Sequence, residues 1–282
     1  MTTVSVIIPT YNRREILARA LDSVLGQTHQ PHEVWVVDDG STDGTAQMLA
    51  ADYPDVRVIM QENRGVSAAR NAGISACSGQ WIALLDSDDS WLPTKLERQL
   101  DAISANPDLR LCHTDEIWIR NGVRINPKHK HQKRGGWIFE HCLPLCCISP
   151  SSVLIHREVF EAIGLFDEEL VACEDYDYWL RFCSRQPVLY VDELLLIKTG
   201  GHDDQLSKKH WGMDRFRMRA LEKLLLDDSV TTLSGAERQA AIDMLIHKAE
   251  VYLIGARKRE KTDEITHYEQ KIAQFSQPRC TP

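Results

Sequence analysis

The chain has 282 residues, 43% of them hydrophobic and 26% charged, and its formal net charge is −8. This composition is ordinary for a globular protein, and a core of this size needs no disulfide support. The negative charge argues against nucleic acid as a bulk partner. No apolar run approaches the length of about 18 residues that marks a transmembrane helix. No signal peptide precedes the first apolar run at Val4, so we expect a cytoplasmic location.

The eight cysteines are irregularly spaced, and no C-x-x-C motif occurs. Cys142, Cys146 and Cys147 could bind a metal together with His141. We favour reduced, mostly buried thiols, which are usual in cytosolic proteins.

The first half of the chain repeats one unit of structure. Apolar segments typical of strands begin near residues 4, 34, 56, 81 and 109. Helical patterns occupy the intervals, at 17–25, 46–51, 66–76 and 93–103. Strands and helices alternating at this length predict right-handed crossovers and a mostly parallel sheet with helices on both faces. The fold class is therefore α/β, of Rossmann-like type.

Polar residues follow each of these strands, at the sheet edge where open α/β proteins bind ligands. The first strand leads into residues 9–13, the second into 38–43 and the third into 62–65, which precede Arg70. There is neither a G-x-G-x-x-G motif after the first strand nor a G-x-x-x-x-G-K-[ST] motif. The pattern therefore indicates a nucleotide site without the usual glycine-rich loop.

An acidic cluster follows the fourth strand, where Asp86, Asp88 and Asp89 lie within four residues. If the backbone stays extended, Asp86 and Asp88 point to the same side and repel each other. A hard divalent cation that also holds a phosphate would relieve this repulsion. The alternative is a solvated acidic turn before the helix near Pro93.

The second half is less regular. The basic stretch 128–136 ends in glycines and suggests a mobile loop, either a solvated surface or a clamp on an anionic acceptor or pyrophosphate. A strand at 151–155, a helix at 157–163 and a strand at 188–191 are predicted. Between them, Glu174 and Asp175 open a further helix, where the helix dipole favours acidic residues in any case. As a pair they could instead face the nucleotide edge.

Residues 211–282 have helical patterns throughout, at about 211–227, 235–258 and 262–275. We therefore divide the chain into a domain at 1–210 and a helical region at 211–282. The first helix combines basic residues with an apolar stripe. It could lie on a membrane surface, but packing against the first domain or against a second subunit, as in a homodimer, is the favoured interpretation.

These motifs, taken in order, resemble family 2 glycosyltransferases, inverting enzymes with the GT-A fold. The resemblance covers about 205 residues and rests on five segments: 4–13, 37–45, 63–71, 86–89, and 164–168 with Glu174, Asp175 and Trp179. It does not extend to the helical tail. The segment 115–150, where an acceptor would bind, has no close match to the family pattern.

The resemblance implies roles for particular residues. Asp175 matches the catalytic base, with Glu174 and Trp179 as acceptor-side candidates. Asp88 and His202 would hold Mg²⁺ or Mn²⁺ on the diphosphate. The residues implied to contact the donor follow the first four strands or lie on the third helix: Pro9, Thr10, Tyr11, Arg13, Asp39, Arg70 and Asp86.

The expected reaction is transfer of a sugar from a nucleoside diphosphate sugar, with uridine the favoured base, to a hydroxyl of a saccharide or lipid-linked acceptor. Assembly of bacterial surface polysaccharide or glycolipid would suit it, in the cytoplasm or at the inner face of the membrane. Two alternatives remain open. A sugar nucleotidyltransferase would need a glycine-rich basic loop, which 10–15 lacks, and a non-catalytic nucleotide-sugar-binding protein would not need all four of Asp39, Asp86, Asp88 and Asp175.

Overall fold

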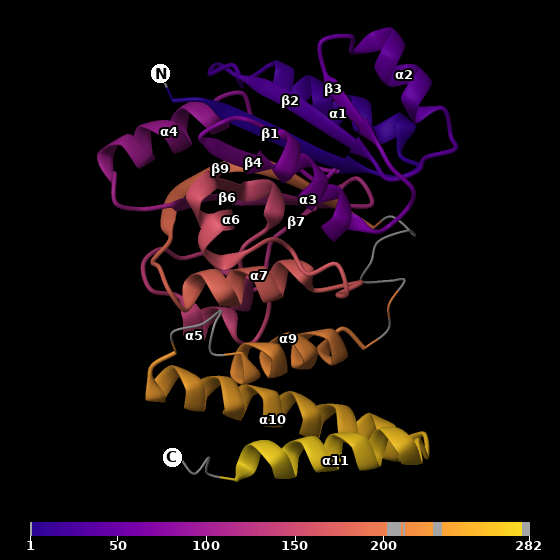
Figure 1. Cartoon of the computed structure of the whole chain (residues 1–282), viewed down its shortest axis with the longest axis vertical. Coiled ribbons are helices and arrows are strands. Elements are labelled where there is room, and N and C mark those ends of the chain that lie inside the picture. The colour runs from indigo at the N-terminus through magenta and orange to yellow at the C-terminus, as the bar shows by residue number, and fades with distance from the viewer. Residues whose placement is uncertain (1, 202–209, 211, 228–232, 278–282) are drawn as a thin grey trace.

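The computed structural model describes residues 2–201, 210, 212–227 and 233–277. Within them, one nine-stranded sheet has the order β3-β2-β1-β4-β8-β6-β9-β5, with β7 paired to β6 (Figure 1). The strands are β1 (Val4–Thr10), β2 (Glu33–Asp38), β3 (Arg57–Met60), β4 (Trp81–Leu84), β5 (Ser90–Trp91), β6 (Leu111–Arg120), β7 (Val123–Ile125), β8 (Val153–His156) and β9 (Leu189–Gly200).

The predicted parallel sheet is confirmed for the first four strands. β1 pairs in parallel with both β2 and β4, and β2 pairs in parallel with β3. β5, β7 and β8 are antiparallel to their neighbours, whereas β6 and β9 run parallel to each other. The strand order reverses between β1 and β4, so the crevice in which such sheets bind ligands lies beyond the ends of these two strands.

Helices cover both faces of the sheet because side chains alternate along each strand. Ile7 of β1 belongs to one buried apolar cluster, and its neighbours Val6 and Ile8 belong to the other. The second cluster includes residues of α1 (Arg14–Leu25), α2 (Thr45–Asp52) and α4 (Lys95–Ala105). The first includes residues of α3 (Val66–Ala76), α6 (Arg157–Ile163) and α7 (Glu174–Cys183).

Some predicted boundaries were wrong. The segment predicted as a strand at 151–155 begins with a 3₁₀ turn, η2 (Pro150–Ser152), and becomes a strand only at Val153. The short strand predicted at 188–191 is the first part of β9, which extends to Gly200. Asp192 and Glu193 interrupt its apolar residues, and the apolar run resumes only at Leu194. A short helix, α5 (Phe139–Cys142), interrupts the irregular segment before η2.

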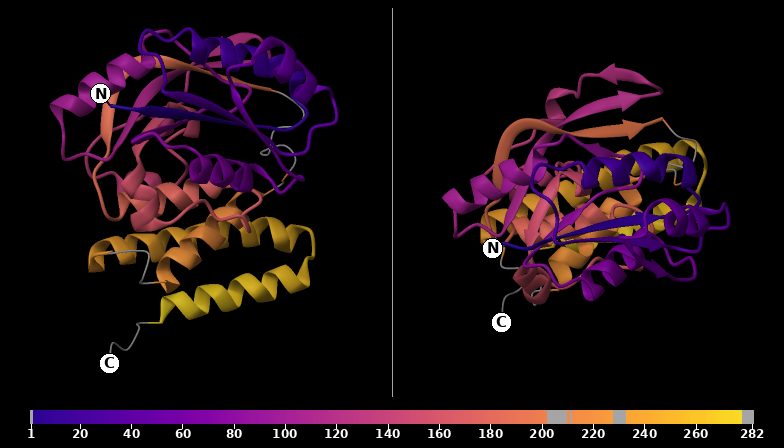
Figure 2. Two further views of the ribbon diagram at one scale, coloured as in Figure 1. Left: turned by 45° about the horizontal axis from the view of Figure 1, so that its top comes forward. Right: turned by 90° about the horizontal axis from the view of Figure 1, so that it is seen from above.

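The tail forms three helices, as predicted: α9 (Asp214–Leu226), α10 (Gly235–Lys258) and α11 (Thr262–Ser276). They stack together beside α7 in Figure 1, and the left view of Figure 2 shows the same stacking. Leu221, Leu224 and Leu225 of α9 belong to the same buried cluster as the core of α7. This apolar stripe is therefore covered by protein and is not free for a membrane surface. None of the described helices is long and apolar enough to span a membrane.

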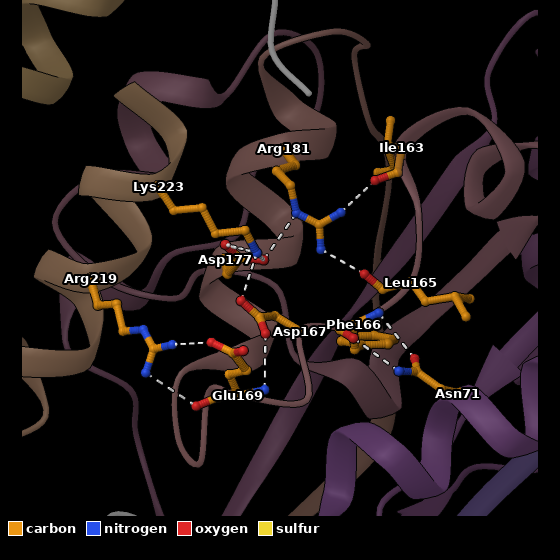
Figure 3. Close-up of polar contacts among 10 residues, drawn as sticks. All are labelled: Asn71, Ile163, Leu165, Phe166, Asp167, Glu169, Asp177, Arg181, Arg219 and Lys223. Carbon is orange, nitrogen blue, oxygen red and sulfur yellow. Dashed lines mark hydrogen bonds and ion pairs between the residues drawn. The ribbon is translucent and has the colours of Figure 1, made fainter. Parts of the chain in front are cut away.

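Partly buried ion pairs reinforce the contact between α9 and α7 (Figure 3). Lys223 of α9 donates to Asp167 at 2.8 Å and to Asp177 at 3.2 Å. Asp177 also accepts from Arg181 at 3.0 Å, and Arg181 donates onward to the carbonyl oxygens of Ile163 and Leu165. The predicted division near residue 210 thus crosses a continuous core.

One lysine, at the start of α4, is fully buried. Lys95 is 0% exposed, its ammonium lies 4.1 Å from the centre of the Trp91 ring, and it donates to Gln99 at 2.7 Å. Burial lowers the pKa of Lys95 to about 7. In the unfolded chain the same group titrates near 10.5, so the folded state binds fewer protons between these values.

We predict that Lys95→Met raises the melting temperature more at pH 6 than at pH 9. Below pH 7 the folded wild type must hold a buried ammonium, and this penalty fades as the pH rises towards the unfolded pKa. Thermal unfolding of both proteins at the two pH values checks this. An equal gain at both would show that Lys95 does not titrate on unfolding.

Candidate active site

The loops after β1 and β2 are locked together at the carboxyl edge of the sheet. The amide of Asn12 donates to Ser41 Oγ at 2.8 Å, and the amide of Thr42 donates to Asn12 Oδ1 at 2.8 Å. Asn12 adopts a positive φ of 50°, which asparagine tolerates better than most residues. Pro9 and Thr10, the last residues of β1, are buried, and Tyr11 directly after them is 47% exposed.

Asp39 is buried and shapes the loop that leads into α3. Its carboxylate accepts from Gln61 Nε2 at 2.7 Å and from the amides of Arg64 and Gly65 at 2.9 and 2.8 Å. A carboxylate offers about four lone-pair positions, so roughly one remains for a ligand. The family resemblance implied that Asp39 contacts the donor, but it did not indicate this structural role.

The acidic cluster after β4 does not continue as an extended strand. A turn closes there, with the amide of Asp89 donating to the Asp86 carbonyl oxygen at 3.0 Å. Each carboxylate therefore meets a different partner. Asp86 pairs with Arg70 at 2.7 Å and Asp88 pairs with Arg13 at 2.7 Å. The premise that Asp86 and Asp88 share one side of an extended strand is corrected: nearby cations relieve their repulsion.

Asp89, to which the sequence analysis gave no role of its own, connects three elements. It accepts from Ser151 Oγ at 2.6 Å and from the amide of Thr199 in β9 at 2.9 Å. Burial raises the pKa of Asp89 to about 8, although the charge of Lys198 opposes this shift. The third carboxylate of the cluster thus fixes η2 and the end of β9 against the β4 turn.

The two acidic residues at the start of α7 point to different surroundings. Glu174 is buried and pairs with Arg70 at 2.7 Å. Asp175 is partly exposed, and its Oδ2 accepts from the thiol of Cys146 at 3.1 Å. Burial, aided by the charge of Asp175, raises the pKa of Cys146 well above its usual range, so Cys146 stays a donor. Adjacent helical residues diverge by about 100°, which separates the two carboxylates.

Lys198 of β9 is a further cation that the sequence analysis missed. Its ammonium donates to Ser149 Oγ at 3.1 Å. Burial opposes its charge, but the nearby carboxylates of Glu116, Asp89, Asp86 and Asp175 raise the pKa of Lys198 above its ordinary value. The only sequence signal was one lysine directly after the apolar run Leu194–Ile197 of this strand.

The basic segment 128–136 is not simply a solvated loop. It contains a 3₁₀ turn, η1 (His129–His131), and His131 packs against the Trp118 ring with 5.0 Å between centres. The side chain of Lys133 is 3% exposed and its ammonium lies 2.9 Å from Glu116. The charge of Lys133 lowers the pKa of Glu116 to about 2, against the effect of burial. The surface-loop interpretation was therefore wrong for Lys133.

Other candidate residues lie away from the edge or cannot be placed. Trp179 is 1% exposed and packs edge-on against Phe166 and Tyr178, so it is a core residue here. His202 lies outside the described residues. Across those residues, no set of three His, Cys, Asp or Glu side chains could hold a metal, and the described cysteines are free thiols.

We predict that Lys133→Ser destabilises the fold whereas Lys128→Ser and Lys130→Ser do not. Removing one partner of a buried ion pair strands the other charge and costs about 3–5 kcal/mol, whereas surface changes stay within about 0.5 kcal/mol. Urea unfolding of the three variants measures this. Equal free energies of unfolding for the three variants would show that Lys133 is solvated and forms no stabilising buried ion pair.

The family model for glycosyl transferase family 2 matches residues 5–164. An uncharacterized glycosyltransferase of Rickettsia bellii is 34% identical over 218 residues, covering 73% of this chain and 31% of the relative. Chondroitin synthase of Escherichia coli is 30% identical over 205 residues, covering 68% of this chain and 28% of the relative. The chain thus spans about a third of the length of either relative.

Solved structures show the same architecture. The S. aureus TarS structure (residues 1–349) in complex with UDP-GlcNAc has a TM-score of 0.76 at 19% identity, covering 98% of this chain and 82% of that one. The mannosyltransferase PcManGT of Pyrobaculum calidifontis, in complex with GDP-Man and Mn²⁺, has a TM-score of 0.61 at 17% identity, covering 97% and 84%. With its α/β sheet of GT-A type and a family match over more than half its length, the chain belongs to glycosyltransferase family 2.

Proposed function

We propose that the chain is an inverting glycosyltransferase that moves a sugar from a nucleoside diphosphate sugar to an acceptor hydroxyl. One observation carries the proposal. The partly exposed carboxylate of Asp175 and the β4 turn with Asp86 and Asp88 belong to one connected site, because Arg70 contacts both Asp86 and Glu174. Such a transfer requires a base together with carboxylates that can hold a cation on the donor diphosphate.

The base role falls to Asp175. As the acceptor hydroxyl attacks the anomeric carbon, Asp175 would take its proton, a contribution typically of about 10²- to 10⁴-fold in rate. Attack from the face opposite the diphosphate inverts the configuration at that carbon, so no covalent nucleophile is needed. The partly exposed position of Asp175, beside a thiol that stays protonated, keeps its carboxylate available for this role.

The donor would lie beyond the ends of β1 and β4. Tyr11 offers an exposed ring for the nucleobase, and Asp39 retains capacity for about one further hydrogen bond. We favour a uridine donor, which the likeness to a structure with UDP-GlcNAc supports. The likeness to a structure with GDP-Man keeps guanosine as the comparison to be tested.

Asp88, with Asp86 beside it and His202 as the further candidate, would hold Mg²⁺ or Mn²⁺ on the diphosphate. The carboxylate oxygens of Asp86 and Asp88 are hard ligands and fit such an ion, which takes one or two carboxylates plus phosphate oxygens. When bound, it would stabilise the leaving diphosphate as a Lewis acid. In the structure the Asp88 carboxylate faces Arg13 at 2.7 Å. We propose that Arg13 leaves Asp88 for a donor phosphate when the donor and its cation enter.

The acceptor is proposed to be a saccharide or a lipid-linked saccharide of a bacterial surface polymer or glycolipid. The similarity to a chondroitin synthase supports a polysaccharide product. The acceptor would approach Asp175 past Lys198, whose positive charge suits an anionic or polyhydroxylated substrate.

We predict that Asp175→Asn lowers kcat for transfer by about 10²- to 10⁴-fold while UDP affinity stays nearly unchanged. The amide keeps the shape of the side chain but cannot take the proton, and an interaction made only in the transition state affects kcat alone. Steady-state kinetics and UDP calorimetry measure the two quantities. Asp101→Asn, at an exposed position of α4, is the control. Near-normal transfer by Asp175→Asn would remove it as the base.

A further inference from the structure

We propose that Arg70 is a positioning residue that ties the donor side of the site to the helix carrying the base, with Glu174 as its anchor on that helix. The resemblance suggested instead that Arg70 touches the donor and that Glu174 faces the acceptor. The inference rests on the proposed function, because it concerns the placement of Asp175.

The guanidinium of Arg70 is enclosed and shared between two carboxylates. Arg70 is 2% exposed. Its Nη1 donates to Glu174 Oε1 and its Nη2 donates to Asp86 Oδ1, each at 2.7 Å. Glu174 is the first residue of α7, and Asp86 lies two residues beyond the end of β4. The Arg70 side chain of α3 thus joins the turn after β4, on the donor side of the site, to α7, which carries the proposed base Asp175.

The surroundings fix Arg70 in this place. The Phe166 ring covers the guanidinium, with 5.3 Å from its central carbon to the ring centre. Asn71, the next residue of α3, donates to the Phe166 carbonyl oxygen at 2.9 Å and accepts from the Phe166 amide at 3.0 Å (Figure 3). The Arg70-Asn71 pair and the segment 164–167, two motifs far apart in the sequence, therefore form one structural unit.

Arg70 is 2% exposed, so a donor phosphate could reach it only if the side chains that enclose it moved. Both terminal nitrogens are engaged, and the buried Nε has no hydrogen-bond partner among the described residues. Freeing Arg70 would strand Glu174, which is also buried, and an uncompensated buried charge is strongly unfavourable. The arrangement therefore suits a structural bridge better than a ligand for the donor.

The bridge matters for chemistry because Asp175 directly follows Glu174. Holding Glu174 sets the rotation of the first turn of α7 and so the direction of the Asp175 carboxylate. A misplacement of about 1 Å at a reacting group can cost about 10²-fold in rate. A lysine could not replace Arg70, because its single ammonium lacks the planar fork that serves two carboxylates at once.

The test compares Arg70→Lys, Glu174→Gln and the double variant with wild type. We expect Arg70→Lys to lower kcat by about 10²-fold and to leave the Kd for UDP, measured by calorimetry with Mn²⁺, within about twofold. Because the two side chains act through one contact, adding Glu174→Gln to Arg70→Lys should lower kcat little further. Arg98→Lys, in the exposed pair with Glu193, is the matched control.

Two results would overturn the proposal. One is a UDP Kd weakened tenfold or more in Arg70→Lys with kcat retained, which is the behaviour of a donor ligand. The other is a double variant whose kcat falls by the product of the two factors measured for the single variants, because the two side chains would then act independently. If Arg70→Lys fails to fold, kcat and the Kd for UDP are measured on Glu174→Gln instead, with the same expected results.

Amide hydrogen exchange separates this inference from the proposed function, since it needs no turnover. The first turn of α7 should lose protection in Arg70→Lys and keep it in Arg98→Lys. Unchanged protection there would overturn the bridge even in an active enzyme. Wild-type protein that transfers no sugar from any donor tried would instead contradict the proposed function, and the exchange result would still decide the bridge.

Discussion

The buried guanidinium of Arg70 is the contact on which the site depends, because it satisfies two carboxylates from different parts of the fold. Asp86 follows a central strand of the parallel sheet, and Glu174 opens a helix that packs on one face of that sheet. Burial disfavours charge on both groups, and the positive charge of Arg70 opposes this effect in each case. For Asp86 the cation prevails, and the pKa is lowered.

The same principle orders the rest of the edge. Its carboxylates are distributed among separate cations, so that Arg13 faces Asp88, Lys133 faces Glu116, and Lys198 lies near Asp86, Asp89 and Asp175. The site is therefore electrostatically compensated before a ligand arrives. A donor diphosphate with its metal brings both negative and positive charge, so it can exchange with Arg13 at Asp88 without leaving either group unpaired.

Contacts of the helical tail help to hold this arrangement in place. Lys223 of α9 contacts Asp167 and Asp177, and Arg181 fixes the carbonyl oxygens of the segment that ends in Phe166. Phe166 in turn covers Arg70. The tail thus packs on the helix that carries Asp175 and supports it through both apolar and ionic contacts.

Local patterns were enough to predict much of this architecture. Strand–helix alternation gave the first four strands and their helices, because periodicity and burial are local properties, and α3, α6 and the tail helices agree closely with their patterns. Contacts between distant segments were not readable in this way. The partners of Arg70, the buried Lys133 and the position of Lys198 depend on which loops meet in space, and a charged residue in a sequence gives no sign that it will be buried. Asp89 was hidden for the same reason, since its partners Ser151 and Thr199 are remote in the chain.

The most direct measurement is a crystal structure of the chain with a UDP-sugar and Mn²⁺. The account predicts that Arg70 remains within about 2.7–3.2 Å of both Asp86 and Glu174, that Asp88 binds the metal, and that Arg13 moves to a phosphate. A structure in which Arg70 has left Glu174 and contacts the diphosphate would contradict it.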